Sequence, residues 1–205
     1  MLSTYVRHPD LLLTFSSAYL LGTVFNHLFP EVYCESVAQY KGFFILGGIF
    51  IQILLENITH GIEHGHLYHN KKRSFPYGML IGLCIHSILE GSSILSTDYT
   101  LLWAVVIHKI PVAMILYIFL SKTLQKRKNI IGLMSIFALS SPLGFLLSNL
   151  PFFTQHHDSI MALVSGVFIH IATVILFESS EEHRLNWIKV FTFFLGVVLS
   201  YVLLP

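Results

Sequence analysis

Long apolar stretches alternate with short polar ones along the whole chain of 205 residues. A helix needs about 20 predominantly apolar residues to cross the hydrocarbon core of a bilayer. The pattern therefore predicts an all-α fold, a polytopic bundle of membrane-spanning helices that makes up a single domain over residues 1–205. The seven predicted spans are 11–30, 42–58, 76–97, 100–120, 129–149, 159–178 and 187–204.

The composition agrees with a membrane protein and excludes an ordinary soluble domain. Hydrophobic residues make up 54% of the chain and charged residues only 11%, whereas charged residues usually account for about 25% of a soluble domain. The lipid bilayer is thus the first expected partner, and no nucleic-acid partner is expected. Cys34 and Cys84 are isolated, so neither a disulfide framework nor a thiolate metal site is predicted. No cleavable signal peptide is expected before the first span.

The basic residues lie almost entirely on one side of the predicted membrane. Those on the crowded side are Arg7, Lys71, Lys72, Arg73, Lys122, Lys126, Arg127, Lys128, Arg184 and Lys189. Lys41 falls on the other side, and Lys109 falls inside a span. Because cytoplasmic loops collect Lys and Arg, the N-terminus is predicted to be cytoplasmic and the C-terminus outside. We expect an integral protein of the plasma membrane or of a bacterial inner membrane.

Ionisable side chains interrupt the third and fourth predicted spans. His86 and Glu90 are four residues apart, so they share one helix face. If the connection turns near Asp98, Glu90 lies 8 residues before the turn, His86 lies 12 before it and His108 lies 10 after it. With a rise of about 1.5 Å per residue, His108 is then level with the first two. Three candidate metal ligands therefore meet at one depth.

Two imidazoles and one carboxylate are a ligand set that Zn2+ accepts, and Fe2+, Mn2+ or Cd2+ can be held by the same groups. A buried His–Glu pair can also merely fasten helices, but several convergent ionisable groups in lipid usually mark a pathway. Lys109 is expected to pair with Glu90 when the ion is absent and to repel a second cation. The sequence thus predicts a single-ion site.

Pro111 and Pro142 lie inside the fourth and fifth spans and are expected to interrupt them. Each frees the carbonyl four residues earlier, at Ile107 and Ala138. Broken helices near the middle of the membrane occur in transporters, although proline kinks are also common in inert bundles.

Further polar residues lie on either side of the predicted site. His27 and Glu31, near His156, His157 and Asp158, are predicted to form an outer entry funnel. His170, deep in the sixth span, is predicted to line the path. A histidine-rich cytoplasmic loop, 59–75, is predicted to receive the released ion, together with five residues on the inner side: Glu56, Glu178, Glu181, Glu182 and His183. The loop histidines are His60, His64, His66 and His69.

The motifs "CIHSILEG" and "VIHKIPVA" resemble the metal-binding pair of the ZIP (Zrt/Irt-like protein) family of divalent metal transporters. Other stretches are similar to further helices of that family: "LLGTVFNHLFPE", "GFFILGG", "LLEN", "FALSSPLG" and "SGVFIHIATVILFE". The resemblance covers nearly the whole chain. It implies an eight-helix bundle that moves Zn2+ or similar ions, as transported substrate, into the cytoplasm by alternating access, with one helix group sliding against another.

Carried over position by position, the resemblance implies that His86, Glu90 and His108 are metal ligands. Ser87 stands where many members have asparagine, Lys109 where two-ion members have an oxygen ligand, and Val112 where many have glutamate or histidine. These departures favour one ion. The family's first helix is missing from this chain, so we expect either a misassigned start or a seven-helix member. In such a member the mobile group would either be incomplete or be completed by a partner chain, for example in a homodimer.

Two other functions stay open at this point. Buried histidines in seven spans also describe an intramembrane zinc-dependent hydrolase, which needs a polarised water and usually a nearby acid or serine, such as Ser87, Ser92 or Ser93. The helix-breaking prolines and Lys109 fit such an enzyme less well, and no enzymatic activity is expected. The third function is a transport-deficient, metal-sensing homologue, suggested by the missing helix and by Val112.

Overall fold

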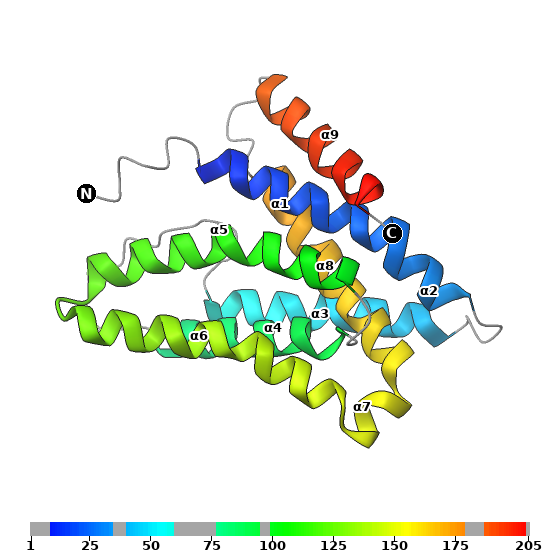
Figure 1. Cartoon of the computed structure of the whole chain (residues 1–205), viewed down its shortest axis with the longest axis horizontal. Helices are drawn as coiled ribbons and strands as arrows, with labels where there is room; N and C mark the ends of the chain where they lie inside the picture. The colour runs from blue at the N-terminus through cyan, green and yellow to red at the C-terminus, as the bar shows by residue number, and fades with distance from the viewer. Residues whose placement is uncertain (1–8, 35–39, 60–76, 95–98, 179–186, 204–205) are drawn as a thin grey trace.

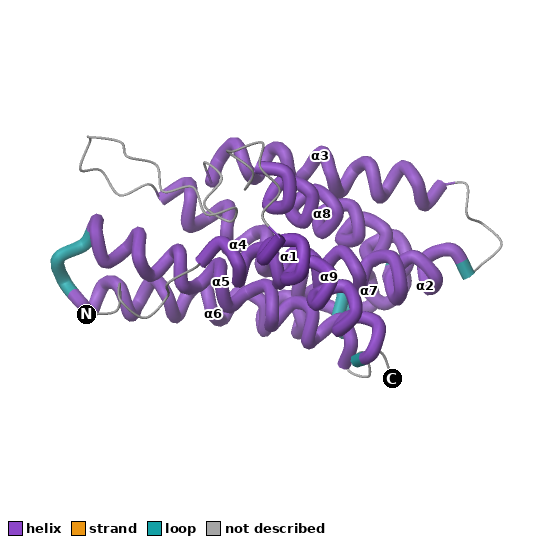
Figure 2. Tube along the Cα trace, turned by 90° about the horizontal axis from the view of Figure 1, so that it is seen from above, coloured by secondary structure: helices purple, strands orange, loops and turns teal. Residues whose placement is uncertain are grey.

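The computed structural model of the chain describes residues 9–34, 40–59, 77–94, 99–178 and 187–203. Every regular element in these ranges is a helix, and the helices gather into one elongated bundle (Figures 1 and 2). They are α1 (Pro9–Thr23), η2 (Val24–Leu28), α2 (Phe29–Tyr33), α3 (Lys41–Thr59), α4 (Tyr77–Ser92), α5 (Tyr99–Thr123), α6 (Arg127–Ser148), α7 (Pro151–Gln155), α8 (His157–Glu178) and α9 (Trp187–Val202).

The helices coincide with the predicted apolar stretches, because a chain in lipid must satisfy its backbone hydrogen bonds within each segment. Five of them are long and apolar enough to cross a membrane: Leu11–Tyr33, Lys41–Thr59, Tyr99–Thr123, Arg127–Ser148 and His157–Leu176. The other two predicted spans correspond to α4 and α9, which have 16 described residues each. The all-α membrane bundle is confirmed, and the total of seven crossings stays a prediction.

The first span contains an irregularity that the apolar pattern did not indicate. Its middle, η2, is a π-helix in which the backbone N–H of Phe29 bonds to the carbonyl of Val24, five residues earlier. Such wide turns insert one extra residue into a helix and occur frequently at functional sites. His27 lies within this turn.

The two intramembrane prolines do not break their helices. α5 continues through Pro111 and α6 continues through Pro142 without a change of element. The prediction that Pro111 and Pro142 interrupt their spans is therefore wrong. A single missing N–H removes only one hydrogen bond, which a long helix packed among neighbours tolerates.

Three helix pairs touch backbone to backbone, and each pair does so through glycine (Figure 1). A side chain added at Gly48 of α3 or at Gly166 of α8 would overlap a backbone carbonyl of the other helix. The same holds for Gly91 of α4 and Gly144 of α6. In the pair of α1 and α9, a Cβ at Gly196 would lie 2.7 Å from a carbonyl oxygen of α1. Small residues permit this close approach, which is how helices pack in membranes.

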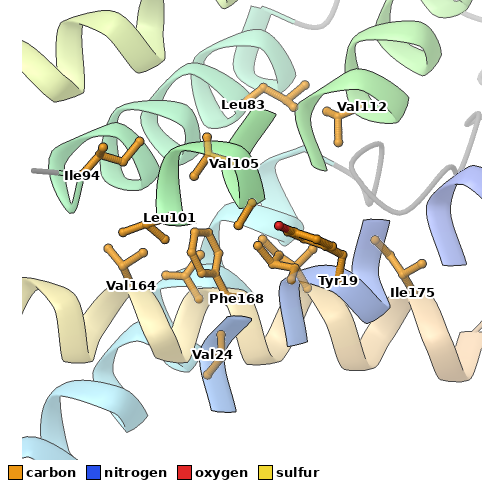
Figure 3. Packing of buried hydrophobic residues seen from close by; sticks show 14 of the residues in the cluster. Tyr19, Val24, Leu83, Ile94, Leu101, Val105, Val112, Val164, Phe168 and Ile175 are labelled. Atoms are coloured by element: carbon orange, nitrogen blue, oxygen red, sulfur yellow. The ribbon is translucent and has the colours of Figure 1, made fainter. Parts of the chain in front are cut away.

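Buried apolar side chains join these pairs to one another. Leu101 and Val105 of α5 point toward Phe168 of α8 and Tyr19 of α1 (Figure 3). All four side chains are at most 2% exposed. This cluster packs α5 against α1 and α8, and so positions the helix that carries His108 in this conformation.

Candidate metal centre

α4 presents His86 and Glu90 on one buried face. Each residue is only 2% exposed, and Nε2 of His86 lies 3.1 Å from Oε1 of Glu90. The four-residue spacing places the two side chains one turn apart, as expected. The carboxylate therefore has an imidazole beside it in a buried region.

His108 of α5 completes the cluster from the neighbouring helix. It is 1% exposed, and its ring stands nearly perpendicular to that of His86, at 81° with 6.3 Å between centroids. One ligand atom from each of His86, Glu90 and His108 can be chosen so that all three lie within 4.8 Å of one another. The convergence expected from counting residues around Asp98 is present in the structure.

The donor set and its spacing suit a single divalent cation. Neither ring nitrogen of His108 has a hydrogen-bond partner in the described part of the chain. Leaving a buried polar atom without a partner costs about 1–3 kcal/mol, so a buried imidazole in this position needs a reason. Around tetrahedral zinc, ligand atoms lie roughly 3.4 Å apart given bonds of about 2.1 Å. Side-chain rotations that move each ligand atom by about an ångström would therefore bring the three atoms to the spacing that an ion requires.

Gln52 of α3 supports the centre from a third helix. Its side chain is fully buried, and its Oε1 lies 3.2 Å from Nδ1 of His86. The amide oxygen accepts a hydrogen bond from Nδ1, and this leaves Nε2 as the nitrogen that faces Glu90. Groups that hold the far nitrogen of a histidine ligand orient the ring and raise its basicity.

Lys109 does not pair with Glu90 as expected. Its Nζ donates to the hydroxyl of Ser141 on α6 and lies 4.8 Å from the centroid of the Phe137 ring. Both partners come from α6, whose rotation about its axis the sequence did not reveal. The ammonium of Lys109 is stabilised by a neutral oxygen and an aromatic face, and it forms no ion pair with Glu90.

Ser87 and Val112 flank the ligands and offer no further charged donor. Val112 lies one turn beyond His108 on α5 and is 3% exposed, so it forms an apolar wall. Ser87 is 1% exposed, and its carbonyl oxygen accepts a hydrogen bond of 3.1 Å from the hydroxyl of Ser141. Its own hydroxyl has no hydrogen-bond partner among the described residues.

Two serines near the centre are engaged with the backbone. The hydroxyl of Ser92 donates to the carbonyl of Leu89 at 2.8 Å, and that of Ser93 donates to the carbonyl of Glu90 at 2.9 Å. These bonds close the last turn of α4. The two hydroxyls thus satisfy backbone carbonyls at the end of α4. A hydrolase would instead need a serine hydroxyl directed at the ion.

The residues of the predicted entry funnel fall into separate contacts. Nε2 of His27 and Oε2 of Glu31 are 4.0 Å apart and partly exposed. Asp158 lies 3.2 Å from Nζ of Lys41, so a basic residue neutralises its charge and ties α8 to α3. Nε2 of His157 lies 3.3 Å from the carbonyl oxygen of Ser93. The funnel stays a prediction, and Asp158 belongs to the fastening of two helices.

On the predicted inner half, His170 of α8 contacts Glu56 of α3, with Nε2 2.7 Å from Oε2. The two side chains are 14% and 28% exposed. The sequence predicted His170 along the path and Glu56 on the inner side, but it did not indicate that the two residues meet. The predicted release loop, with His60, His64, His66 and His69, lies outside the described residues.

Reading the sequence missed Gln52 and Ser141. A glutamine inside the apolar run 42–58 is costly to bury without a partner, and that was the available signal. Ser141 offered less, because a serine can bond to its own helix.

A comparison with protein families matches residues 71–204 to the ZIP zinc transporter family. The chain belongs to this family. The matched segment contains His86, Glu90 and His108, and it excludes Gln52 and Glu56. No curated protein and no solved structure shows a significant match to this ZIP family member.

Membership settles the broad class of the protein. ZIP proteins are membrane transporters of divalent metals, typically zinc, and are not enzymes. The apolar helices agree with an integral membrane protein that has lipid and metal ions as partners. The buried cluster of His86, Glu90 and His108 on α4 and α5 has the donor atoms and the spacing to hold a dication.

Proposed function

We propose that this ZIP family member carries Zn2+, or a dication with similar preferences, into the cytoplasm through one central site. His86, Glu90 and His108 would be the ligands, and Gln52 would orient the His86 ring. The observation that carries the proposal is the burial of all three ligands, at most 2% exposed, with ligand atoms within 4.8 Å of one another. Burying three ionisable side chains within a membrane costs free energy unless a cation or another partner compensates them.

A single ion fits the surroundings better than two. Lys109, the residue after His108, brings a fixed positive charge next to the centre, and Val112 supplies no oxygen where a second ion would need one. Two dications a few ångströms apart repel each other strongly unless carboxylates lie between and around them. Glu90 is the one carboxylate of the cluster.

The distribution of ligands among helices supports alternating access. All three ligands come from α4 and α5, whereas the backbone-packed pairs of α3 with α8 and α1 with α9 contribute none. The ligands can therefore move together past those pairs without leaving the ion. The inward direction follows what ZIP family resemblance implies, and the crowding of Lys and Arg on one side supports a cytoplasmic N-terminus.

The test is Zn2+ uptake by lipid vesicles that contain the purified protein and a trapped zinc-sensitive dye. Wild type is expected to load the vesicles, and Glu90→Gln, His86→Ala and His108→Ala are each expected to reduce loading to that of protein-free vesicles. Asp158→Asn is the matched control, because it makes the same carboxylate-to-amide change at the 3.2 Å contact with Lys41, away from the ligands.

Uptake by all three ligand variants at the wild-type rate would overturn the proposal. Binding of Zn2+ by wild type without any uptake would instead favour the metal-sensing alternative. Because Glu90→Gln nearly preserves the shape of the side chain, loss of uptake in that variant reports on charge and ligation.

A further inference from the structure

A second pair of metal-binding side chains lies between α3 and α8. Oε2 of Glu56 and Nε2 of His170 are 2.7 Å apart, and the two residues are 114 positions apart in the chain. Carboxylate oxygen and imidazole nitrogen are both ligands that zinc and similar ions accept. At 28% and 14% exposure, the side chains are sheltered but can still be reached.

Glu56 lies one helical turn from the residue of α3 that contacts the central site, on the predicted inner side of it. On α3, Glu56 follows Gln52 by four residues, so the two share a helix face about 6 Å apart along the axis. Gln52 contacts His86 of the central cluster. Since α3 begins at Lys41 on the predicted outer side, the step from Gln52 to Glu56 leads toward the cytoplasm.

The helices that carry the pair are held rigidly. Gly48 and Gly166 bring the backbones of α3 and α8 into direct contact, and Lys41 pairs with Asp158 at their outer ends. Two side chains on such a frame have a separation that is set before any ligand arrives. Preorganisation of this kind lowers the cost of binding.

We propose that Glu56 and His170 form a second, weaker cation site that receives the ion as it leaves the central cluster. Two protein ligands, with the remaining positions open to water, favour weak binding and fast exchange. An ion can leave such a site readily, as transport requires. The role as a relay rests on the proposed function, whereas cation binding at the pair does not.

The experiment is equilibrium dialysis of the purified full-length protein against Cd2+, which counts bound ions per chain. Glu56→Gln and His170→Gln are each expected to bind about one Cd2+ fewer than wild type, and Glu90→Gln is expected to lose a different, tighter ion. The combined Glu56→Gln and Glu90→Gln variant should lose both. Histidines elsewhere contribute equally to every variant, so the differences report on these sites alone.

A purely structural role for the pair predicts another result. Glutamine at position 56 can still accept a hydrogen bond from His170, so Glu56→Gln would keep the helices fastened and keep the wild-type count. If the folded Glu56→Gln and His170→Gln proteins bind as many Cd2+ ions per chain as wild type, the inference is overturned. A loss in Asp158→Asn, which loosens the same two helices at their other end without touching the pair, would also overturn it.

Uptake measurements separate this inference from the proposed function. If Glu56→Gln loses a Cd2+ while wild type carries no ion, the site stands and the transport proposal fails. If wild type carries Zn2+ and Glu56→Gln slows uptake several-fold with unchanged affinity at the central cluster, both stand. If transport needs Glu90 but is unaffected by Glu56→Gln, the pair is not a relay, and only the central site is supported.

Discussion

Replacing Gln52 with leucine should weaken cation binding without removing any ligand. Leucine has nearly the same volume as glutamine and suits the fully buried position, but it removes the oxygen that lies 3.2 Å from Nδ1 of His86. The imidazole then loses the acceptor that holds its ring toward Glu90. Nε2 is consequently less well placed and less basic when an ion arrives.

The expected size of the effect follows from the geometry. A distance of 3.2 Å is at the long end for an N–H···O bond, which indicates a neutral bond of ordinary strength. Such bonds contribute about 0.5–1.5 kcal/mol net, and loss of a group that supports a metal ligand commonly weakens affinity about 10–100-fold. We therefore expect the dissociation constant for Zn2+ to rise about tenfold in Gln52→Leu.

Competition between the purified protein and a zinc chelator of known affinity measures this change. Gln52→Glu, which retains an acceptor oxygen, should bind at least as tightly as wild type. Thr59→Val is the matched control, because Thr59 is a buried polar residue of the same helix whose hydroxyl donates to the backbone of α3, at the carbonyl of Glu56. A dissociation constant for folded Gln52→Leu within about twofold of wild type would refute the reasoning.

Two further predictions concern the frame and the charge of the site. Gly91→Ala places a methyl group against a backbone carbonyl of α6 and should lower stability by about 1–3 kcal/mol in a thermal unfolding assay in detergent. Gly47→Ala, with no atom within 4 Å of the added carbon, should not lower it, and equal losses in both would contradict the packing argument. Lys109→Glu removes the fixed cation and adds a carboxylate, so dialysis should find about one more Cd2+ per chain than in wild type. An unchanged count in folded protein would show that Lys109 does not limit the site to one ion.

The apolar pattern was sufficient to predict the helices, because an apolar segment of this length that crosses a bilayer satisfies its backbone hydrogen bonds by forming a helix. It did not reveal the π-helical turn at Val24–Leu28, since a wide turn needs no particular residue. It also gave too much weight to Pro111 and Pro142. Whether a proline breaks a helix depends on the packing around the freed carbonyl, and the sequence alone does not show that packing.

The depth of the ligands could be predicted because the rise of a helix is constant. His86, Glu90 and His108 needed only a turning point and a rise per residue to be placed at one level. The surroundings depended on the rotation of α3 and α6, which no count along the chain provides. Gln52 was therefore missed, and Lys109 was assigned the wrong partner.

The glycine contacts between helices have a consequence for how this protein can change over evolutionary time. Where α4 meets α6 and α3 meets α8, main-chain atoms set the separation, and these are the same whatever side chains face the lipid. The outer surface can thus adapt to membranes of different thickness or fluidity while the interior keeps its dimensions. Tolerance to substitution should be high on the lipid-facing surface and very low at Gly48, Gly91 and Gly166.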